Sequence, residues 1–259
     1  MGRALVIVCL LAAHARADEA LKPQRWYQGK HGTNRVVHFS ITTAALLAHP
    51  VFNFLEEGIE CNWCGGPNAF DAGARNALVW SDTRTPARMS DISSYVLAPT
   101  AAFGLVLAGT VSTPSTAAVM DDMIPIAEAM IVTQWVTRTL KITIARTRPY
   151  AHFTDESSNE DNLSFPSGHT SLPFALVTSA GMIAHARGYK SEPYIWAIGL
   201  TFALSSGYLR IAADRHYVTD VATGALIGVS AGLTVPLLMS RDNVRLTPMG
   251  SGMAFAGVW

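Results

Sequence analysis

Four long stretches without Asp, Glu, Lys or Arg constrain the fold of this chain more than any other feature. They cover residues 92–120, 170–186, 193–209 and 221–239, so each has at least 17 residues. An α-helix needs roughly 20 apolar residues to cross a bilayer, and these stretches approach or exceed that length. They contain Gly, Ala, Ser and Thr throughout, as closely packed membrane helices do. The pattern predicts an all-α bundle of five to six largely apolar helices, embedded in a membrane.

Two further segments would complete the bundle. Residues 123–145 predict one long helix that ends before Pro149, because proline cannot continue the hydrogen bonding of a helix. Residues 36–54 are a weaker helix candidate, since Pro50 and several polar residues interrupt them. The sequence shows no internal repeat and no extended alternation typical of strands.

The composition excludes several classes of protein. Charged residues make up 15% of the chain, well below the roughly 25% of a typical soluble domain. Hydrophobic residues make up 49%, which excludes a disordered chain. The 19 basic and 19 acidic residues balance, so we expect no nucleic-acid partner. The three cysteines are too few for a small protein held together by disulfides.

The first residues have the pattern of a secretory signal peptide at residues 1–17. Arg3 gives a positive start, residues 5–13 are apolar, and Ala15 and Ala17 form a small-x-small cleavage site. The rest of the chain divides into an N-terminal segment (18–90) with the weak helix and a CxxC loop, the helical bundle (91–240) and a C-terminal tail (241–259).

Polar residues gather in three short clusters at the ends of the apolar segments. The clusters are Lys141-x6-Arg148-Pro149, Pro166-Ser167-Gly168-His169 and Arg210-x5-His216-x3-Asp220. Each alone has an ordinary explanation, as surface cations, a helix N-cap or a local polar pair. If successive helices alternate in direction, however, all three fall at the same end of the bundle. The cations, the serine hydroxyl and the glycine N–H would then surround a phosphate group.

Together the three clusters resemble the signature of the superfamily of type 2 phosphatidic acid phosphatases and vanadium haloperoxidases. All three occur in the order typical of that family. One position differs, because the family usually has Ser before the arginine of the third cluster and this chain has Leu209. The resemblance implies a helical bundle with a phosphate site at one end and a hydrolase that needs no metal or other cofactor. Vanadate is expected as an inhibitor, or as a cofactor only in a haloperoxidase.

The resemblance also implies a phosphohistidine mechanism. His216 would attack phosphorus, and Asp220 would orient it and stabilise its imidazolium. His169 would protonate the leaving oxygen and then activate water. The expected phosphate-binding residues are Lys141, Arg148, Ser167, Gly168 and Arg210.

A lipid phosphate or diphosphate, of the phosphatidate or polyprenyl-diphosphate type, is the expected substrate, because the apolar bundle adjoins the site. Three alternatives remain open at this point. They are a soluble secreted non-specific acid phosphatase, a vanadium-dependent haloperoxidase and a non-catalytic phospholipid-binding protein. This chain is much shorter than the haloperoxidases of the family, and a binding protein would not need both histidines. The lipid headgroup and the oligomeric state do not follow from the sequence.

The charge pattern bears on location. With a cleaved signal, five spans would begin near residues 93, 118, 169, 193 and 217. They place the three clusters on the outer side of the membrane and the basic residues after 186 and 240 on the cytoplasmic side, in agreement with the positive-inside tendency. A sixth span at 36–54 would reverse this orientation. We therefore expect a cell-envelope protein, in the inner or plasma membrane with a periplasmic site, or alternatively a soluble secreted or periplasmic one.

The sequence contains a single CxxC motif, formed by Cys61 and Cys64. In an oxidising compartment a local disulfide is the expected state. A thioredoxin-like redox motif would need a βαβ context, which this chain lacks, and a zinc site would need two further ligands. The sequence therefore predicts no metal site here.

Overall fold

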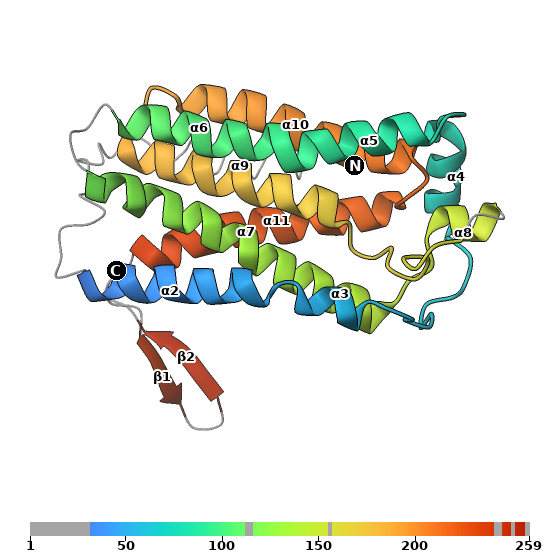
Figure 1. The fold of residues 1–259 in the computed structure, drawn as a ribbon, viewed down its shortest axis with the longest axis horizontal. Coiled ribbons are helices and arrows are strands. Elements are labelled where there is room, and N and C mark those ends of the chain that lie inside the picture. The colour runs from blue at the N-terminus through green and yellow to red at the C-terminus, as the bar shows by residue number, and fades with distance from the viewer. Residues whose placement is uncertain (1–31, 112–115, 155–156, 241–244, 250–251, 257–259) are drawn as a thin grey trace.

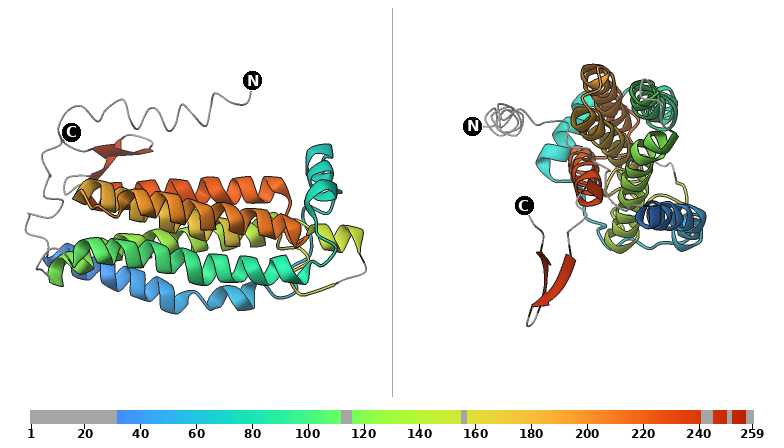
Figure 2. Two further views of the ribbon diagram at one scale, coloured as in Figure 1. Left: turned by 90° about the horizontal axis from the view of Figure 1, so that it is seen from above. Right: turned by 90° about the vertical axis from the view of Figure 1, so that its left-hand side faces the viewer.

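Long helices that run along a common axis make up the fold (Figures 1 and 2). The computed structural model describes residues 32–111, 116–154, 157–240, 245–249 and 252–256. The expected signal peptide therefore lies outside the described residues. The helices are α2 (Gly32–Ala48), α3 (Val51–Leu55), α4 (Ala69–Leu78), α5 (Arg84–Ile92), the π-helix η1 (Ser93–Leu97), α6 (Ala98–Thr110), α7 (Thr116–Ile144), α8 (Pro149–Phe153), α9 (Gly168–Arg187), α10 (Glu192–Ala212) and α11 (Val218–Ser240). β1 (Arg245–Met249) and β2 (Gly252–Ala256) pair as an antiparallel hairpin.

The all-α bundle is as the apolar segments predict, and α9 forms its centre. This helix packs against α6, α7, α10 and α11, and most of its side chains are buried. A helix with apolar or small residues on all sides is stable only when other helices surround it. It ends at Gly188, whose φ of 66° is the left-handed conformation of a helix C-cap.

Small residues let α11 lie directly against α9. Gly224, Gly228 and Gly232 follow one another at intervals of four, so they form a stripe on one face of α11. A methyl group at Gly228 would collide with the Ser171 carbonyl oxygen and would lie 2.9 Å from the Ala175 nitrogen. The two backbones are therefore in contact along this stripe, as in membrane helix pairs with small residues at their interface.

The segment expected as a weak helix forms two helices. Residues His49 and Pro50 separate α2 from α3, at the position where proline interrupts the pattern. α2 lies along α7 (Figure 1), and His38 Nδ1 of α2 lies 2.9 Å from the Glu128 carboxylate of α7. The acid inside the apolar part of α7 therefore has a partner.

Among the described residues, three helical segments are long and apolar enough to cross a membrane by length and composition: Arg84–Thr110, Glu192–Ala212 and Val218–Met239. The first is continuous through α5, η1 and α6. Large apolar side chains point outward from these segments. Leu204 is 62% exposed and Leu226 is 66% exposed. Such an apolar outer surface suits a lipid environment and supports a membrane location.

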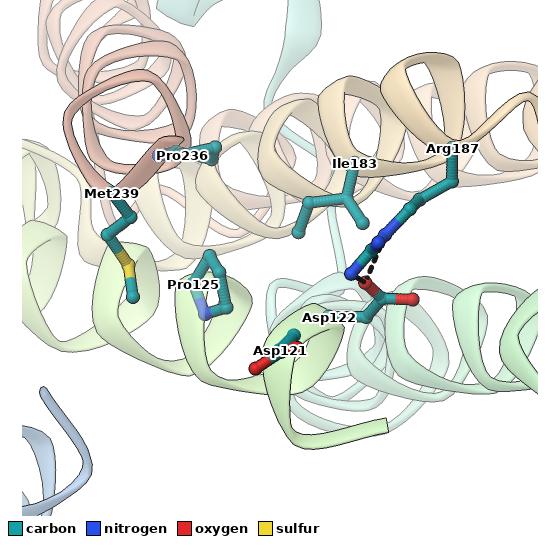
Figure 3. Close-up of a pocket in the computed structure, with 7 residues that line it drawn as sticks. All are labelled: Asp121, Asp122, Pro125, Ile183, Arg187, Pro236 and Met239. Carbon is teal, nitrogen blue, oxygen red and sulfur yellow. Dashed lines mark hydrogen bonds and ion pairs between the residues drawn. The ribbon is translucent and has the colours of Figure 1, made fainter. Parts of the chain in front are cut away.

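The two ends of the bundle differ. At one end, α4 lies across the long helices and α8 is close to it (Figures 1 and 2). At the other, the buried carboxylate of Asp122 accepts a hydrogen bond from Arg187 at 2.7 Å (Figure 3). It also accepts one from the Thr110 hydroxyl at 2.7 Å. Both ionic partners come from helix ends, so this ion pair ties α7 to α9.

The contact between α9 and α11 predicts the effect of a single methyl group. Gly228→Ala should destabilise the protein by about 1–3 kcal/mol, the usual cost of overpacking. Thermal unfolding of the detergent-purified protein measures this. Gly104→Ala is the matched control, because nothing lies within 4 Å of the added methyl group there. Equal unfolding temperatures for the two variants would contradict the backbone contact.

Candidate functional site

A cavity opens at the end of the bundle where α7 and α10 end and α9 begins. It is lined by Glu56, Tyr95, Gln134, Thr137, Arg138, Lys141, Arg148, Glu160, Leu163, Gly168, His169, Arg210 and His216. The structure thus brings residues of all three sequence clusters to one site, at the end of the bundle that the alternation of helix directions predicts. The expected site residues that do not line the cavity are Ser167 and Asp220.

Helix ends and sharp turns position these side chains. Lys141 lies in the last turn of α7, and Ala145 follows it with a φ of 43°, which turns the chain away from the helix axis. Arg148 is the N-cap residue of α8. Arg210 lies in the last turn of α10, and Asp214, with a φ of 57°, turns the chain toward His216.

The cations in the cavity wall have unused hydrogen-bond donors. Arg148 donates to the Glu160 carboxylate at 2.8 Å, but its Nη1 is buried without a partner. The Nε of Arg210 is also buried without a partner. Lys141 donates to the Leu163 carbonyl oxygen. Buried donors without acceptors are rare and costly in proteins, so this wall is suited to an anion that supplies several acceptor oxygens.

His216 lies at the bottom of the site with only 2% of its surface exposed. Its Nδ1 faces Asp220 Oδ2 at 3.6 Å, which leaves Nε2 as the ring nitrogen free to react. Burial, reinforced by the nearby Lys141 and Arg148 charges, lowers the pKa of His216 well below its usual value. The neutral imidazole, which is the nucleophilic form, is therefore favoured.

His169 lies at the N-terminus of α9, and its side chain is 18% exposed. Its Nε2 is 2.7 Å from Asp91 Oδ1. Burial and then the Arg210 charge lower the pKa of His169 to about 4, while the hydrogen bond to Asp91 acts in the opposite direction. Sequence reasoning did not identify Asp91 as part of the site.

Ser167 supports the site from behind the cavity lining. It is fully buried, and its hydroxyl oxygen accepts a hydrogen bond from the Thr170 hydroxyl at 2.9 Å. Its backbone N–H donates to the Asp220 carbonyl oxygen at 3.0 Å. The start of α9 is therefore attached to the first turn of α11.

The Asp220 carboxylate is held by groups on several sides. Oδ2 accepts from the Ser164 hydroxyl at 2.6 Å and from the Tyr217 N–H at 2.9 Å. Oδ1 accepts from Arg146 Nη1 at 2.6 Å. Arg146 also donates to Asp71 at 2.8 Å, so it bridges two fully buried carboxylates. Sequence reasoning missed Arg146, Ser164 and Asp71.

The loop that contains the CxxC motif packs against Arg146. Cys61 and Cys64 are joined by a disulfide, and Trp63 between them exchanges backbone hydrogen bonds with residues 145 and 147. The Arg146 guanidinium lies 4.3 Å from the centre of the Trp63 ring and 4.2 Å from that of Tyr217. Both rings stabilise the buried guanidinium through cation–π contact.

Residues 122–243 match the family model of the PAP2 superfamily, and all three clusters fall inside that segment. That segment is a little under half of the chain, and over it the chain is similar to the PAP2 superfamily. It is 36% identical over 96 residues to the lipid A 1-phosphatase of Porphyromonas gingivalis, a match that covers 34% of this chain and 21% of that protein.

Two solved structures resemble this chain. Aquifex aeolicus LpxE has a TM-score of 0.44 and 22% identity, over 64% of this chain and 91% of that one. A transmembrane PAP2-type phosphatidylglycerolphosphate phosphatase from Bacillus subtilis has a TM-score of 0.49 and 18% identity, over 76% of this chain and 94% of that one. Asp71 and Asp91 come from outside the segment that matches the PAP2 model.

The Arg146 bridge predicts a strong effect on stability. Arg146→Ala leaves two buried carboxylates without their counter-ion and should cost about 3–5 kcal/mol. Arg146→Lys should recover only part of this, because an ammonium group cannot reproduce the planar donor set of a guanidinium. Arg88→Ala, at an exposed position of α5, is the control. Thermal unfolding of Arg146→Ala at the temperature of the control would show that the bridge contributes nothing.

Proposed function

We propose that this protein is a phosphatase that hydrolyses a lipid phosphate or diphosphate through a phosphohistidine intermediate, without a metal ion. The observation that carries the proposal is the cavity wall, where Arg148 and Arg210 have buried donors without acceptors and two histidines line the same cavity. A phosphoryl group supplies acceptor oxygens to those donors and a phosphorus atom to a neutral imidazole. The relationship to a lipid A 1-phosphatase also supports a lipid substrate.

In the first step, His216 Nε2 forms a bond to phosphorus while the bond from phosphorus to the leaving oxygen breaks. The leaving oxygen takes a proton from the His169 imidazolium, which becomes neutral. Asp220 stabilises the positive charge that develops on His216. Lys141, Arg148 and Arg210 stabilise the charge on the phosphoryl oxygens. The bound phosphoryl group also brings negative charge to His169, which favours its protonated form.

In the second step, the neutral His169 takes a proton from water as the water oxygen bonds to phosphorus. The bond between phosphorus and His216 Nε2 breaks, and its electron pair returns to the ring. Phosphate leaves, and both histidines regain their starting states. The two steps need two histidines in different roles, and both His169 and His216 line the cavity.

The apolar outer surface of the bundle supports a substrate that arrives from the bilayer. In the orientation that we propose, the end of the bundle with the cavity faces the periplasm, so the enzyme would act on the outer leaflet of the inner or plasma membrane. The basic residues of the α9–α10 turn would then lie inside, in accordance with the positive-inside tendency.

The first test is phosphate release from phosphatidate, a polyprenyl diphosphate and a soluble aryl phosphate by detergent-purified protein. His216→Ala should lower the rate by roughly 10³-fold or more, because it removes the nucleophile. His185→Ala, an exposed histidine at the far end of α9, should leave it unchanged. The proposal is supported if the wild type releases phosphate from the lipids and the His216→Ala variant does not. Release only from the aryl phosphate would instead indicate a soluble-type phosphatase, and an active His216 variant would refute the mechanism.

A second prediction concerns ions. Treatment with EDTA should leave the rate of phosphate release unchanged, because the side chains themselves supply the positive charge of the site. Orthovanadate should inhibit competitively, because vanadate adopts the five-coordinate geometry that phosphorus reaches during the reaction. Loss of activity on chelation that Mg²⁺ or Zn²⁺ restores would contradict metal-independent hydrolysis.

A further inference from the structure

One stretch of the continuous α5–η1–α6 helix contacts His169 through three of its residues. Asp91 Oδ1 lies 2.7 Å from His169 Nε2 and 3.6 Å from Arg210 Nη1. The Ser94 hydroxyl donates to the His169 carbonyl oxygen at 2.9 Å. The Tyr95 ring meets the imidazole edge-on, with 4.8 Å between ring centres. Three residues from one segment thus contact a single histidine.

The helix geometry changes within this stretch. α5 ends at Ile92, and η1 continues as a π-helix over Ser93–Leu97 before α6 resumes the α-helical geometry. π-helical turns inside α-helices are rare and are frequent at functional sites. Here the π-helical turn begins two residues after Asp91 and contains both Ser94 and Tyr95. The unusual geometry is therefore located where the helix contacts His169.

Asp91 fixes which nitrogen of His169 can act on a substrate. A carboxylate can only accept a hydrogen bond, so Nε2 carries a proton toward Asp91. Nδ1 is then the ring nitrogen available to the substrate. This arrangement resembles that of His216, where the carboxylate of Asp220 faces one nitrogen and leaves the other free. The exposure of the two acids differs, because the Asp91 side chain is 54% exposed whereas that of Asp220 is fully buried.

We propose that Asp91 is a positioning residue for His169, which holds the imidazole with Nδ1 toward the substrate and stabilises its protonated form. The inference rests on the proposed phosphatase function, and it adds to the site a residue from outside the matched PAP2 segment. When Nδ1–H gives its proton to the leaving oxygen, the hydrogen bond from Nε2–H to Asp91 remains. When Nδ1 takes a proton from water, the imidazolium forms again beside the carboxylate.

The charges around His169 explain why it needs an acid. The charged and titratable groups that act on it or share its cavity are Arg210 on α10, Arg138 and Lys141 on α7, Glu56 after α3, Arg148 and Glu160 on the connecting loop, His216 before α11, Asp91 on α5 and Tyr95 on η1. Glu56 lies 3.4 Å from Arg138 and is paired with it. The nearby arginines disfavour an imidazolium. Glu160 is already paired with Arg148. Among the residues that the structure describes, Asp91 is the acid in direct contact with the ring.

The test compares Asp91→Asn with the wild type on two substrates that differ in their leaving group. In an alkyl phosphate, such as phosphatidate, the leaving group is a strongly basic alkoxide oxygen, which needs a proton from the general acid. In 4-nitrophenyl phosphate the leaving group is a stable phenolate, which does not need that proton. We expect kcat/KM for the alkyl phosphate to fall about 10-fold or more. This is part of the roughly 10²–10⁴-fold acceleration that general acid catalysis contributes as a whole. For the nitrophenyl ester, kcat/KM should change less than threefold, about the scatter of a surface substitution.

The pH profile gives a second readout. Removing the carboxylate charge lowers the pKa of His169, so less imidazolium is present at any given pH. The alkaline limb of kcat/KM for the alkyl phosphate should therefore shift to lower pH in Asp91→Asn. Asp91→Glu, which keeps the charge and the acceptor, should recover part of the activity. Glu57→Gln makes the same change of charge at an exposed position and should behave as the wild type.

The outcomes separate the two proposals. A wild type that hydrolyses neither substrate refutes the phosphatase and with it the role of Asp91. A wild type that hydrolyses both, with equal losses on both substrates in Asp91→Asn, would show that Asp91 acts on phosphate binding through Arg210 or on folding. An unchanged variant would show that Asp91 has no role in the reaction. Only a loss confined to the alkyl phosphate, with the shifted alkaline limb, supports the positioning role.

Discussion

The attachment of the first turn of α11 to the start of α9 is the constraint on which the rest of the site depends. The Ser167 N–H donates to the Asp220 carbonyl oxygen at 3.0 Å, and Gly224 lies directly against the Ser167 backbone. Any side chain at position 224 would separate the two helices. Because His169 follows Ser167 and His216 precedes α11, this backbone contact sets the distance between the two histidines. The glycine stripe that brings α11 onto α9 thus also assembles the site.

The electrostatic design follows from burial. Lys141, Arg148 and Arg210 converge where little water can screen their repulsion, and each is buried. Such an arrangement is stable only if carboxylates and carbonyl groups offset part of the charge and an anion completes the rest. Part of the positive charge is offset by the carboxylates of Glu160 and Asp91 and by the Leu163 carbonyl oxygen. The same positive field favours neutral histidines before substrate binds, so the negative charge of the substrate favours the protonated form of His169 that the first step needs.

Sequence reasoning predicted the parts of this structure that depend on local pattern. The uncharged segments predicted the helices, and alternation of helix direction placed the three clusters at one end. Residues 36–54 were expected as one weak helix, and the structure divides them at His49 and Pro50. It did not find Arg146, Asp71 or Asp91, because their roles depend on partners 74 to 78 residues away. A buried arginine two residues before Arg148 looks the same in the sequence as a surface cation.

The two carboxylates that face the histidines have different surroundings, and this difference fits different tasks. Asp220 accepts hydrogen bonds from Arg146, Ser164 and the Tyr217 N–H, so it is held in place while His216 gains and loses a bond. Asp91 is half exposed and shared between His169 and Arg210, so its hydrogen bond can strengthen as the imidazolium forms. The fixed carboxylate of Asp220 suits a nucleophile, His216, that must hold its position. The solvent-exposed carboxylate of Asp91 suits His169, which takes up and releases a proton in each catalytic cycle.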